Sequence, residues 1–213
     1  MKKISVIFAA LALLAASCTK TEVVSSDVQS SQRGIGFSAY TAKPTKAPQT
    51  DVITDDFNSF QVSAIGNGAV YFNNVTFTKN GEGVWASTPA YFWPAYALDF
   101  YAYNKPTNGA FTPTINTTSQ TLTFTPSTTL ADQEDLVAAY APNQTQPLSG
   151  ATPLTFKHYL TQIVVKALNT NPTYGVEVAG VKIAHMQNKV KYTFSSNTAA
   201  VATDAADETY SSV

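Results

Sequence analysis

The sequence has few of the residues that catalytic and redox chemistry most often requires. Its 213 residues include one cysteine, Cys18, which excludes an intrachain disulfide and leaves no second thiol for nucleophilic work. Charged residues make up 13%, against about 25% in typical soluble domains. Arg33 is the one arginine among 13 basic residues, and the formal net charge is -1. This composition argues against a nucleic-acid-binding surface.

Motifs for catalysis and metal binding are also missing. His158 and His185 are the only histidines, and neither lies beside a cysteine or in an acidic spacing of the metal-ligand type. There is no Gly-x-Ser-x-Gly elbow and no phosphate-binding glycine loop. Acidic groups at 55–56 and 132–135 could hold calcium, but solvated acidic turns are the simpler interpretation, since a defined calcium loop is absent. We therefore expect no enzyme activity, no metal and no cofactor.

The first 17 residues have the pattern of a bacterial lipoprotein signal peptide. Lys2 and Lys3 are followed by an apolar segment, 4–14, that is too short to span a bilayer, and small residues precede Cys18. Acylation of the Cys18 thiol, followed by cleavage before it, would attach the chain to a membrane, because each buried methylene adds about 0.8 kcal/mol. The alternative is an ordinary secretory signal with an unrelated cysteine. No second apolar run is long enough to cross a membrane.

Composition divides the rest of the chain into three parts. Residues 18–33 are rich in Ser, Thr, Val and Gln, which is typical of a flexible tether. Residues 34–196 are rich in aromatic residues and are long enough to form one domain with its own core. Residues 197–213 are mostly Ala, Thr, Ser and Asp. With so little to bury, they indicate either a linker or the start of a truncated second domain.

Apolar and polar residues alternate along the domain with the period of half-buried strands. The pair Asn80-Gly81 tolerates positive φ and predicts a hairpin, in which Gly83 allows a bulge, and Asn67-Gly68 is a second turn signal. Without runs of strong helix formers, this pattern predicts an all-β fold, an antiparallel β-sandwich. The expected strands are 35–40, 60–65, 75–78, 84–85, 98–103, 122–125, 163–168, 176–183 and 190–194.

Eight aromatic residues between positions 85 and 103 have two interpretations. Exposed rings stack on sugar faces, so the group could form a carbohydrate-binding platform. Alternation along the segment that contains Phe100 and Tyr101 turns one face inward, which favours a core instead. The eight residues are Trp85, Tyr91, Phe92, Trp93, Tyr96, Phe100, Tyr101 and Tyr103.

Several segments taken together resemble the fimbrillin-like lipoproteins of the Bacteroidetes envelope. They lie between residues 34 and 168, in the order expected for that family, behind the lipoprotein signal. The segments are Ile35-Gly36-Phe37, 41–43, 45–47, Phe60-Gln61-Val62, Tyr91-Phe92-Trp93-Pro94, 98–103, 134–139 and 154–161.

The resemblance implies a transthyretin-like β-sandwich, usually followed by a second sandwich, in a pilin, anchor or tip subunit. Such a subunit is lipid-anchored at the cell outer membrane and belongs to a fimbrium or the cell surface. In pilin members, cleavage in the loop after the first strand frees a groove, and a donor strand from another fimbrial subunit fills it. The implied partners are other fimbrial subunits, the membrane, and a surface glycan or protein. The rival function is a stand-alone carbohydrate-binding surface lipoprotein.

Three basic residues are candidates for proteolytic processing. Arg33 lies where the tether meets the first expected strand, and Lys43 and Lys46 lie in the proline-containing loop that follows it. The alternative for Arg33 is a solvated charge at the edge of the domain.

Overall fold

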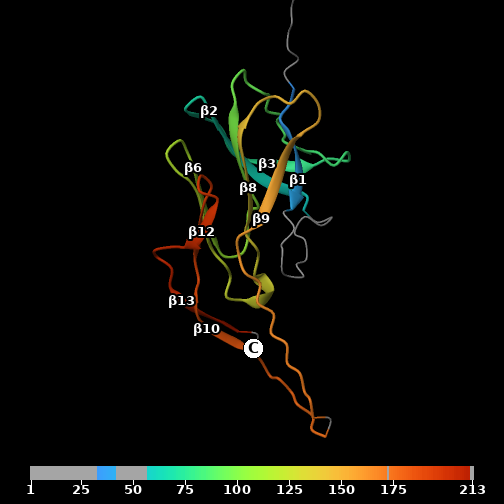
Figure 1. The fold of residues 1–213 in the computed structure, drawn as a ribbon, viewed down its shortest axis with the longest axis vertical. Coiled ribbons are helices and arrows are strands. Elements are labelled where there is room, and N and C mark those ends of the chain that lie inside the picture. The colour runs from blue at the N-terminus through green and yellow to red at the C-terminus, as the bar shows by residue number, and fades with distance from the viewer. Residues whose placement is uncertain (1–32, 42–56, 172, 212–213) are drawn as a thin grey trace, which may run out of the picture. The chain divides into compact units, whose positions relative to one another are not determined.

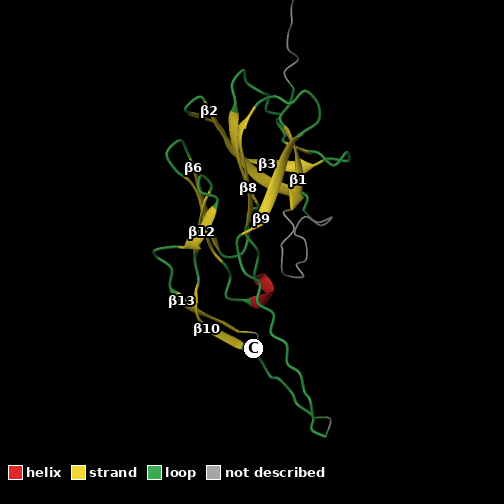
Figure 2. Cartoon of the chain, in the orientation of Figure 1, coloured by secondary structure: helices red, strands yellow, loops and turns green. Residues whose placement is uncertain are grey.

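A computed structural model describes residues 33–41, 57–171 and 173–211. Within these ranges the chain forms thirteen strands and one short 3-10 helix (Figures 1 and 2). The elements are β1 Gly36–Thr41, β2 Ser59–Gly66, β3 Ala69–Lys79, β4 Trp85–Ala86, β5 Leu98–Tyr103, β6 Ala110–Ile115, β7 Gln120–Thr125, η1 Leu130–Asp132, β8 Val137–Gln144, β9 Thr152–His158, β10 Lys182–Gln187, β11 Val190–Thr193, β12 Thr198–Val201 and β13 Asp207–Ser211.

Seven strands form one sheet that closes on itself. They pair in the order β1-β4-β3-β2-β5-β8-β9, and β9 returns to β1. Six of these pairs are antiparallel, and the seventh, between β1 and β9, is parallel. The all-β prediction is confirmed, whereas the two-layer sandwich and its transthyretin-like topology stay predictions.

Two of the expected turns form as the sequence indicates. Asn67 and Gly68 both have positive φ, 50° and 72°, which is the requirement of the two-residue turn that joins β2 to β3. The hairpin at Asn80-Gly81 joins β3 to β4. The Asn80 side-chain carbonyl accepts hydrogen bonds from the N–H groups of Glu82 and Val84, and Gly83 supplies a φ of 77°.

The strands of the closed sheet share a core that is dominated by phenylalanine. Phe37 lies at its centre, with its ring centroid 4.8 Å from that of Phe77 and 5.0 Å from that of Phe100, in edge-to-face geometry. Phe60 and Phe156 continue the cluster at 5.1 Å. Aromatic pairs at these distances are worth about 0.5–1.5 kcal/mol beyond the burial of their area.

A second core lies between β5 and a four-stranded sheet of order β12-β11-β7-β6. Tyr101 and Tyr103 of β5 pack there with Leu122, Phe124, Tyr192 and Phe194. Their neighbours Phe100 and Ala102 point into the first core. Because successive side chains of a strand point to opposite faces, β5 is buried on both.

Two strands expected from the sequence, 163–168 and 176–183, do not form as predicted. The described residues of 161–181 contain no strand, although 163–168 and 176–181 alternate as expected, and only Lys182–Gln187 of that region forms one, β10. Alternation gives a local preference, but a strand also needs a partner to hydrogen-bond with. We call residues 161–181 the arm.

The C-terminal residues are more structured than their composition indicates. Expected as a linker or as the start of a truncated second domain, they contain β12, which pairs with β11, and β13, which pairs with β10. All four residues of β12 are exposed. Main-chain pairing therefore defines this strand, and the sequence has no apolar pattern that would reveal it. Within the ranges described above, no helix is long and apolar enough to cross a membrane.

Candidate strand-exchange site

The seam of the closed sheet is β1, which joins β4 on one side to β9 on the other. It pairs with β9 over five residue pairs, from Phe37 opposite Thr152 to Thr41 opposite Phe156. It pairs with β4 over only two. The Ile35 N–H donates to the Tyr91 carbonyl at 2.7 Å, which fixes the chain as it enters the strand. No other strand of the closed sheet joins β4 to β9.

The side chains of β1 that point inward anchor it in the first core. Phe37 is 0% exposed and Ile35 is 3% exposed. Between them, Gly36 lies so close to its neighbour that an added Cβ would stand 3.2 Å from the Val84 side chain. A strand in this position therefore needs a large apolar residue at 37 and a small one at 36.

The pairing of β9 with β8, its other neighbour in the closed sheet, is short. β9 pairs with β8 through only two residue pairs, Val137 opposite His158 and Ala138 opposite Lys157. Most of its ladder is therefore with β1. A strand that loses its main partner needs other contacts to stay in place, and these occur at the end of β9 that carries His158.

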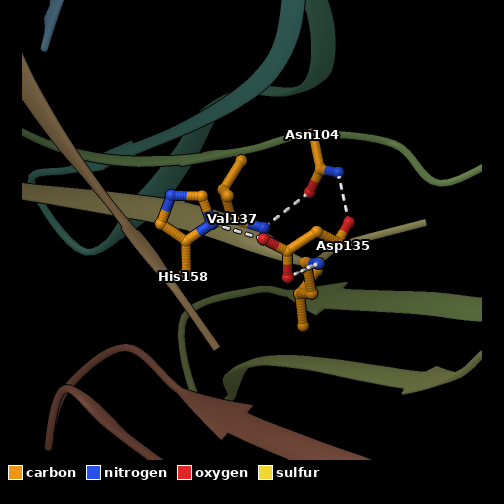
Figure 3. Close-up of polar contacts among 5 residues, drawn as sticks. Asn104, Asp135, Val137 and His158 are labelled. Carbon is orange, nitrogen blue, oxygen red and sulfur yellow. Dashed lines mark hydrogen bonds and ion pairs between the residues drawn. The ribbon is translucent and has the colours of Figure 1, made fainter. Parts of the chain in front are cut away.

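Figure 3 shows a polar cluster that ties the ends of β5, β8 and β9 together. The Asn104 side chain accepts from the Val137 N–H at 2.9 Å and donates to the Asp135 carbonyl at 2.7 Å. The Asn104 N–H donates to the Val137 carbonyl at 3.1 Å. The His158 Nδ1–H donates to the Asp135 carboxylate. We call Asn104, Asp135 and His158 the clasp.

The clasp is enclosed by the fold. The His158 side chain is 9% exposed, and its Nε2 atom is buried without a hydrogen-bond partner among the described residues. The second Asp135 carboxylate oxygen accepts from the Leu136 N–H at 2.7 Å. Directly after β9, the Tyr159 N–H donates to the Leu136 carbonyl at 2.9 Å. The clasp therefore extends the short ladder between β8 and β9.

Glu134 stabilises the loop between β5 and β6. Its carboxylate accepts hydrogen bonds from the N–H groups of Thr107, at 2.5 Å, and Asn108, at 3.2 Å, and from the Thr107 hydroxyl at 2.7 Å. Partial burial alone would raise the pKa of Glu134, but these hydrogen bonds outweigh it and lower the pKa.

Two of the three acidic residues at 132–135 thus have structural partners. Asp135 binds His158, and Glu134 binds the 107–108 loop. In the described part of the chain, no three His, Cys, Asp or Glu side chains are grouped so that they could hold a metal ion.

The predicted processing and lipidation residues are only partly visible. Cys18, Lys43 and Lys46 lie outside the described residues, and their roles stay predictions. Arg33 is exposed, and its carbonyl accepts from the Trp93 N–H at 3.2 Å. Its main chain is therefore held to the fold by a hydrogen bond that a protease would have to break before it could bind this segment.

Most of the eight aromatic residues form core, as alternation favours, and do not form a carbohydrate-binding platform. Trp85, Trp93, Phe100, Tyr101 and Tyr103 are buried in the two cores. Phe92 and Tyr96 are exposed, and Tyr91 is half-buried.

One aromatic residue near this group was missed. The Tyr71 hydroxyl donates to the Phe92 carbonyl at 2.7 Å, and its ring lies 6.4 Å from that of Tyr96. Burial, with Tyr96 and Tyr91 nearby, raises the pKa of Tyr71. No sequence signal marked Tyr71, because it lies at an irregularity of β3, where the register with β2 shifts between Val70 and Phe72 and simple alternation does not hold.

A family model described as fimbrillin-like matches residues 21–212. The chain belongs to the fimbrillin-like family. This confirms the resemblance drawn from the sequence. Comparisons with curated proteins and with solved structures gave no match. Fimbrillin-like proteins are structural and adhesive, which indicates a fimbrial subunit at the cell surface that assembles with other subunits.

Replacing the amide of the clasp tests its contribution to this fimbrillin-like fold. Asn104→Ala removes the partners of the Val137 N–H and the Asp135 carbonyl, so the free energy of unfolding should fall by about 1–3 kcal/mol. Urea denaturation measures the change. Asn58→Ala, at an exposed position before β2, is the control and should stay within about 0.5 kcal/mol of wild type. Equal losses in the two variants would contradict a special role for Asn104.

Glu134 predicts a defined pH dependence of stability. A carboxyl with a lowered pKa stabilises the folded state above its unfolded pKa, near 4.5, and loses that contribution as the pH falls through its folded pKa. Glu134→Gln should therefore melt below wild type at pH 7, and the gap should close progressively below pH 4.5. Thermal melts from pH 7 to pH 3 measure this gap. The exposed Glu82→Gln is the control, and a gap for Glu134→Gln that is constant with pH would contradict the assignment.

Proposed function

We propose that this chain is a lipid-anchored fimbrial subunit of the outer membrane, and that it assembles by exchanging β1 for a strand of another subunit. The observation that supports this most directly is the position of β1. It is the one strand between β4 and β9, and its pairing with β9 is the one parallel pair of the closed sheet.

Loss of β1 would create an acceptor groove with two free edges. The main chains of β4 and β9 would lose their partners, and the space left by Phe37 would expose the rings of Phe77 and Phe100. A strand added to such a groove gains affinity from main-chain hydrogen bonds and specificity from side-chain pockets. The donor needs a large apolar residue where Phe37 now lies.

The same seam supports the finer fold prediction. β4 contributes only two residues to the closed sheet and β1 only six. Opening the sheet at this seam would leave β4-β3-β2-β5-β8-β9 as one continuous sheet. We propose that the acceptor form, in which the sheet is open at β1, is the transthyretin-like sandwich that the family resemblance implies.

Processing after β1 would begin the exchange. Because the main chain of Arg33 is paired with Trp93, Lys43 and Lys46 are the better candidates for the cut. A cut at either residue would leave β1 attached to the tether and separate it from β2. Cys18 would hold the tether, and so the uncut subunit, at the membrane.

The lipid anchor is tested by removing its acceptor atom. Cys18→Ser has no thiol to acylate, so the variant should lose fatty-acid label and move from the membrane fraction to the soluble one, with its thermal melt unchanged. Metabolic labelling and detergent partition measure these properties. Ser17→Ala keeps a small residue before the cysteine and should stay labelled. Wild-type protein without label would reject the anchor.

Strand exchange is tested with a peptide that copies β1. Limited trypsin treatment should nick the loop after β1, and the nicked protein should bind a labelled peptide of residues 34–41, GIGFSAYT. Intact protein should bind far less, because its own β1 occupies the groove. A peptide with serine in place of Phe37 should bind at least about 100-fold more weakly, since it leaves the aromatic pocket empty. Fluorescence anisotropy measures all three affinities.

A charge-neutral variant controls for the position of the cut. Lys43→Gln combined with Lys46→Gln should resist nicking and should not acquire peptide binding, whereas Lys105→Gln, in the loop after β5, should behave as wild type. If nicked wild-type protein binds neither peptide, β1 does not occupy an acceptor groove and strand exchange at this seam is rejected.

A further inference from the structure

The arm exposes apolar side chains that a folded protein ordinarily buries. Every described residue from 161 to 180 is exposed. Seven of them are large and apolar, with exposed fractions from 49% to 85%: Ile163, Val164, Val165, Leu168, Tyr174, Val176 and Val178. Summed over the two limbs, their exposed area is on the order of 1000 Å², whereas the largest apolar patch on a typical monomer is about 300–600 Å².

The arm has two limbs that join at an ordered turn. Asn169 Nδ2 donates to the Tyr174 carbonyl at 2.7 Å, and the Asn171 N–H donates to Asn169 Oδ1 at 2.9 Å. The limbs are residues 161–168 and 176–180. Their side chains alternate as in a β-sheet, but neither limb forms a strand or pairs as a strand of one.

The apolar surface continues from the arm into a groove. Ile163 and Val165 line it together with Ile183 and Met186 of β10 and Val201 of β12, and its volume is about 1160 Å³. Met186 and Val201 are themselves 37% and 58% exposed. A partner seated on the limbs would therefore meet a continuous apolar face that includes β10 and β12.

The charges of the arm indicate what that partner is. Lys166, on the first limb, and Glu177, on the second, are the only charged residues between 161 and 181. One positive and one negative charge on otherwise similar limbs make the arm complementary to itself. In a two-fold symmetric contact, each residue meets its counterpart in reciprocal fashion, so Lys166 of one copy faces Glu177 of the other, twice.

We propose that a second copy of this chain docks on the arm, with the limbs of the two copies pairing as strands across a two-fold axis. The exposed surface matches the roughly 800 Å² per partner of a standard protein interface. Pairing would supply the missing ladder and bury the aliphatic side chains in one step. The arm lies outside β1, β4 and β9, so this contact is separate from the proposed strand exchange.

Sedimentation velocity on the purified full chain carrying Cys18→Ser tests the contact without an acyl chain. The protein should be a dimer at micromolar concentrations. Leu168→Asp, at a position 85% exposed on the arm, should raise the dissociation constant at least about 100-fold, because it places charge in the apolar contact. Leu148→Asp, at a position 97% exposed outside the arm, is the matched control and should leave it unchanged.

Charge reversal tests the symmetry. Lys166→Glu and Glu177→Lys each place like charges opposite one another and should raise the dissociation constant at least about tenfold, whereas the double variant should restore it. Lys43→Gln with Lys46→Gln should not alter association, so failure of strand exchange stays distinguishable. A wild-type chain that is monomeric at about 100 µM, with or without another fimbrial subunit bound to it, overturns the proposal. So does a dimer that Leu168→Asp and the charge reversals leave intact.

Discussion

Phe37 is fully buried among Phe60, Phe77 and Phe100, and the strand that bears it is the one connection between β4 and β9. β1 therefore contributes to the structure through both its main-chain hydrogen bonds and its side-chain packing. Its main chain completes the sheet, and its side chain completes the core. Since both are lost together if the strand leaves, β1 stays in place through strong but local interactions, which is what an exchangeable strand requires.

β9, on the other side of this seam, is held in a different way. Its ladder with β8 is two pairs long, and the clasp lies directly beside it. Partly buried polar groups that are hydrogen-bonded, as Asn104 and Asp135 are, favour a single arrangement of the strands that bear them. The hydrogen bonds of Asn104 and Asp135 thus keep β5, β8 and β9 in register without help from β1.

Local features were predictable from the sequence, and distant pairings were not. Asn67-Gly68 and Asn80-Gly81 determine their turns through their own backbone preferences, so both hairpins could be read directly. The parallel pairing of Phe37 with Thr152 joins segments more than 100 residues apart, and no local signal encodes it. The same holds for the clasp, in which Asn104, Asp135 and His158 come from three strand ends.

The predictions that the structure contradicts also failed for physical reasons. The arm alternates as strands do, yet alternation reports which side chains could be buried and says nothing of what would cover them. β12 shows the reverse, since it is a strand through main-chain pairing alone. The one signal that went unused is in β5. Five of the six residues of Leu98–Tyr103 are apolar, which indicates burial on both faces more than on one.

Because β5 is buried on both faces, it forms part of both hydrophobic cores. Phe100 and Ala102 belong to one core, while Tyr101 and Tyr103 belong to the other, and a single backbone holds both sets in place. A shift of that backbone by a fraction of an ångström cannot improve the packing on one side without disturbing the other. A change in the packing of the first core, where Phe37 lies, would therefore be transmitted through β5 to Tyr101 and Tyr103 in the second.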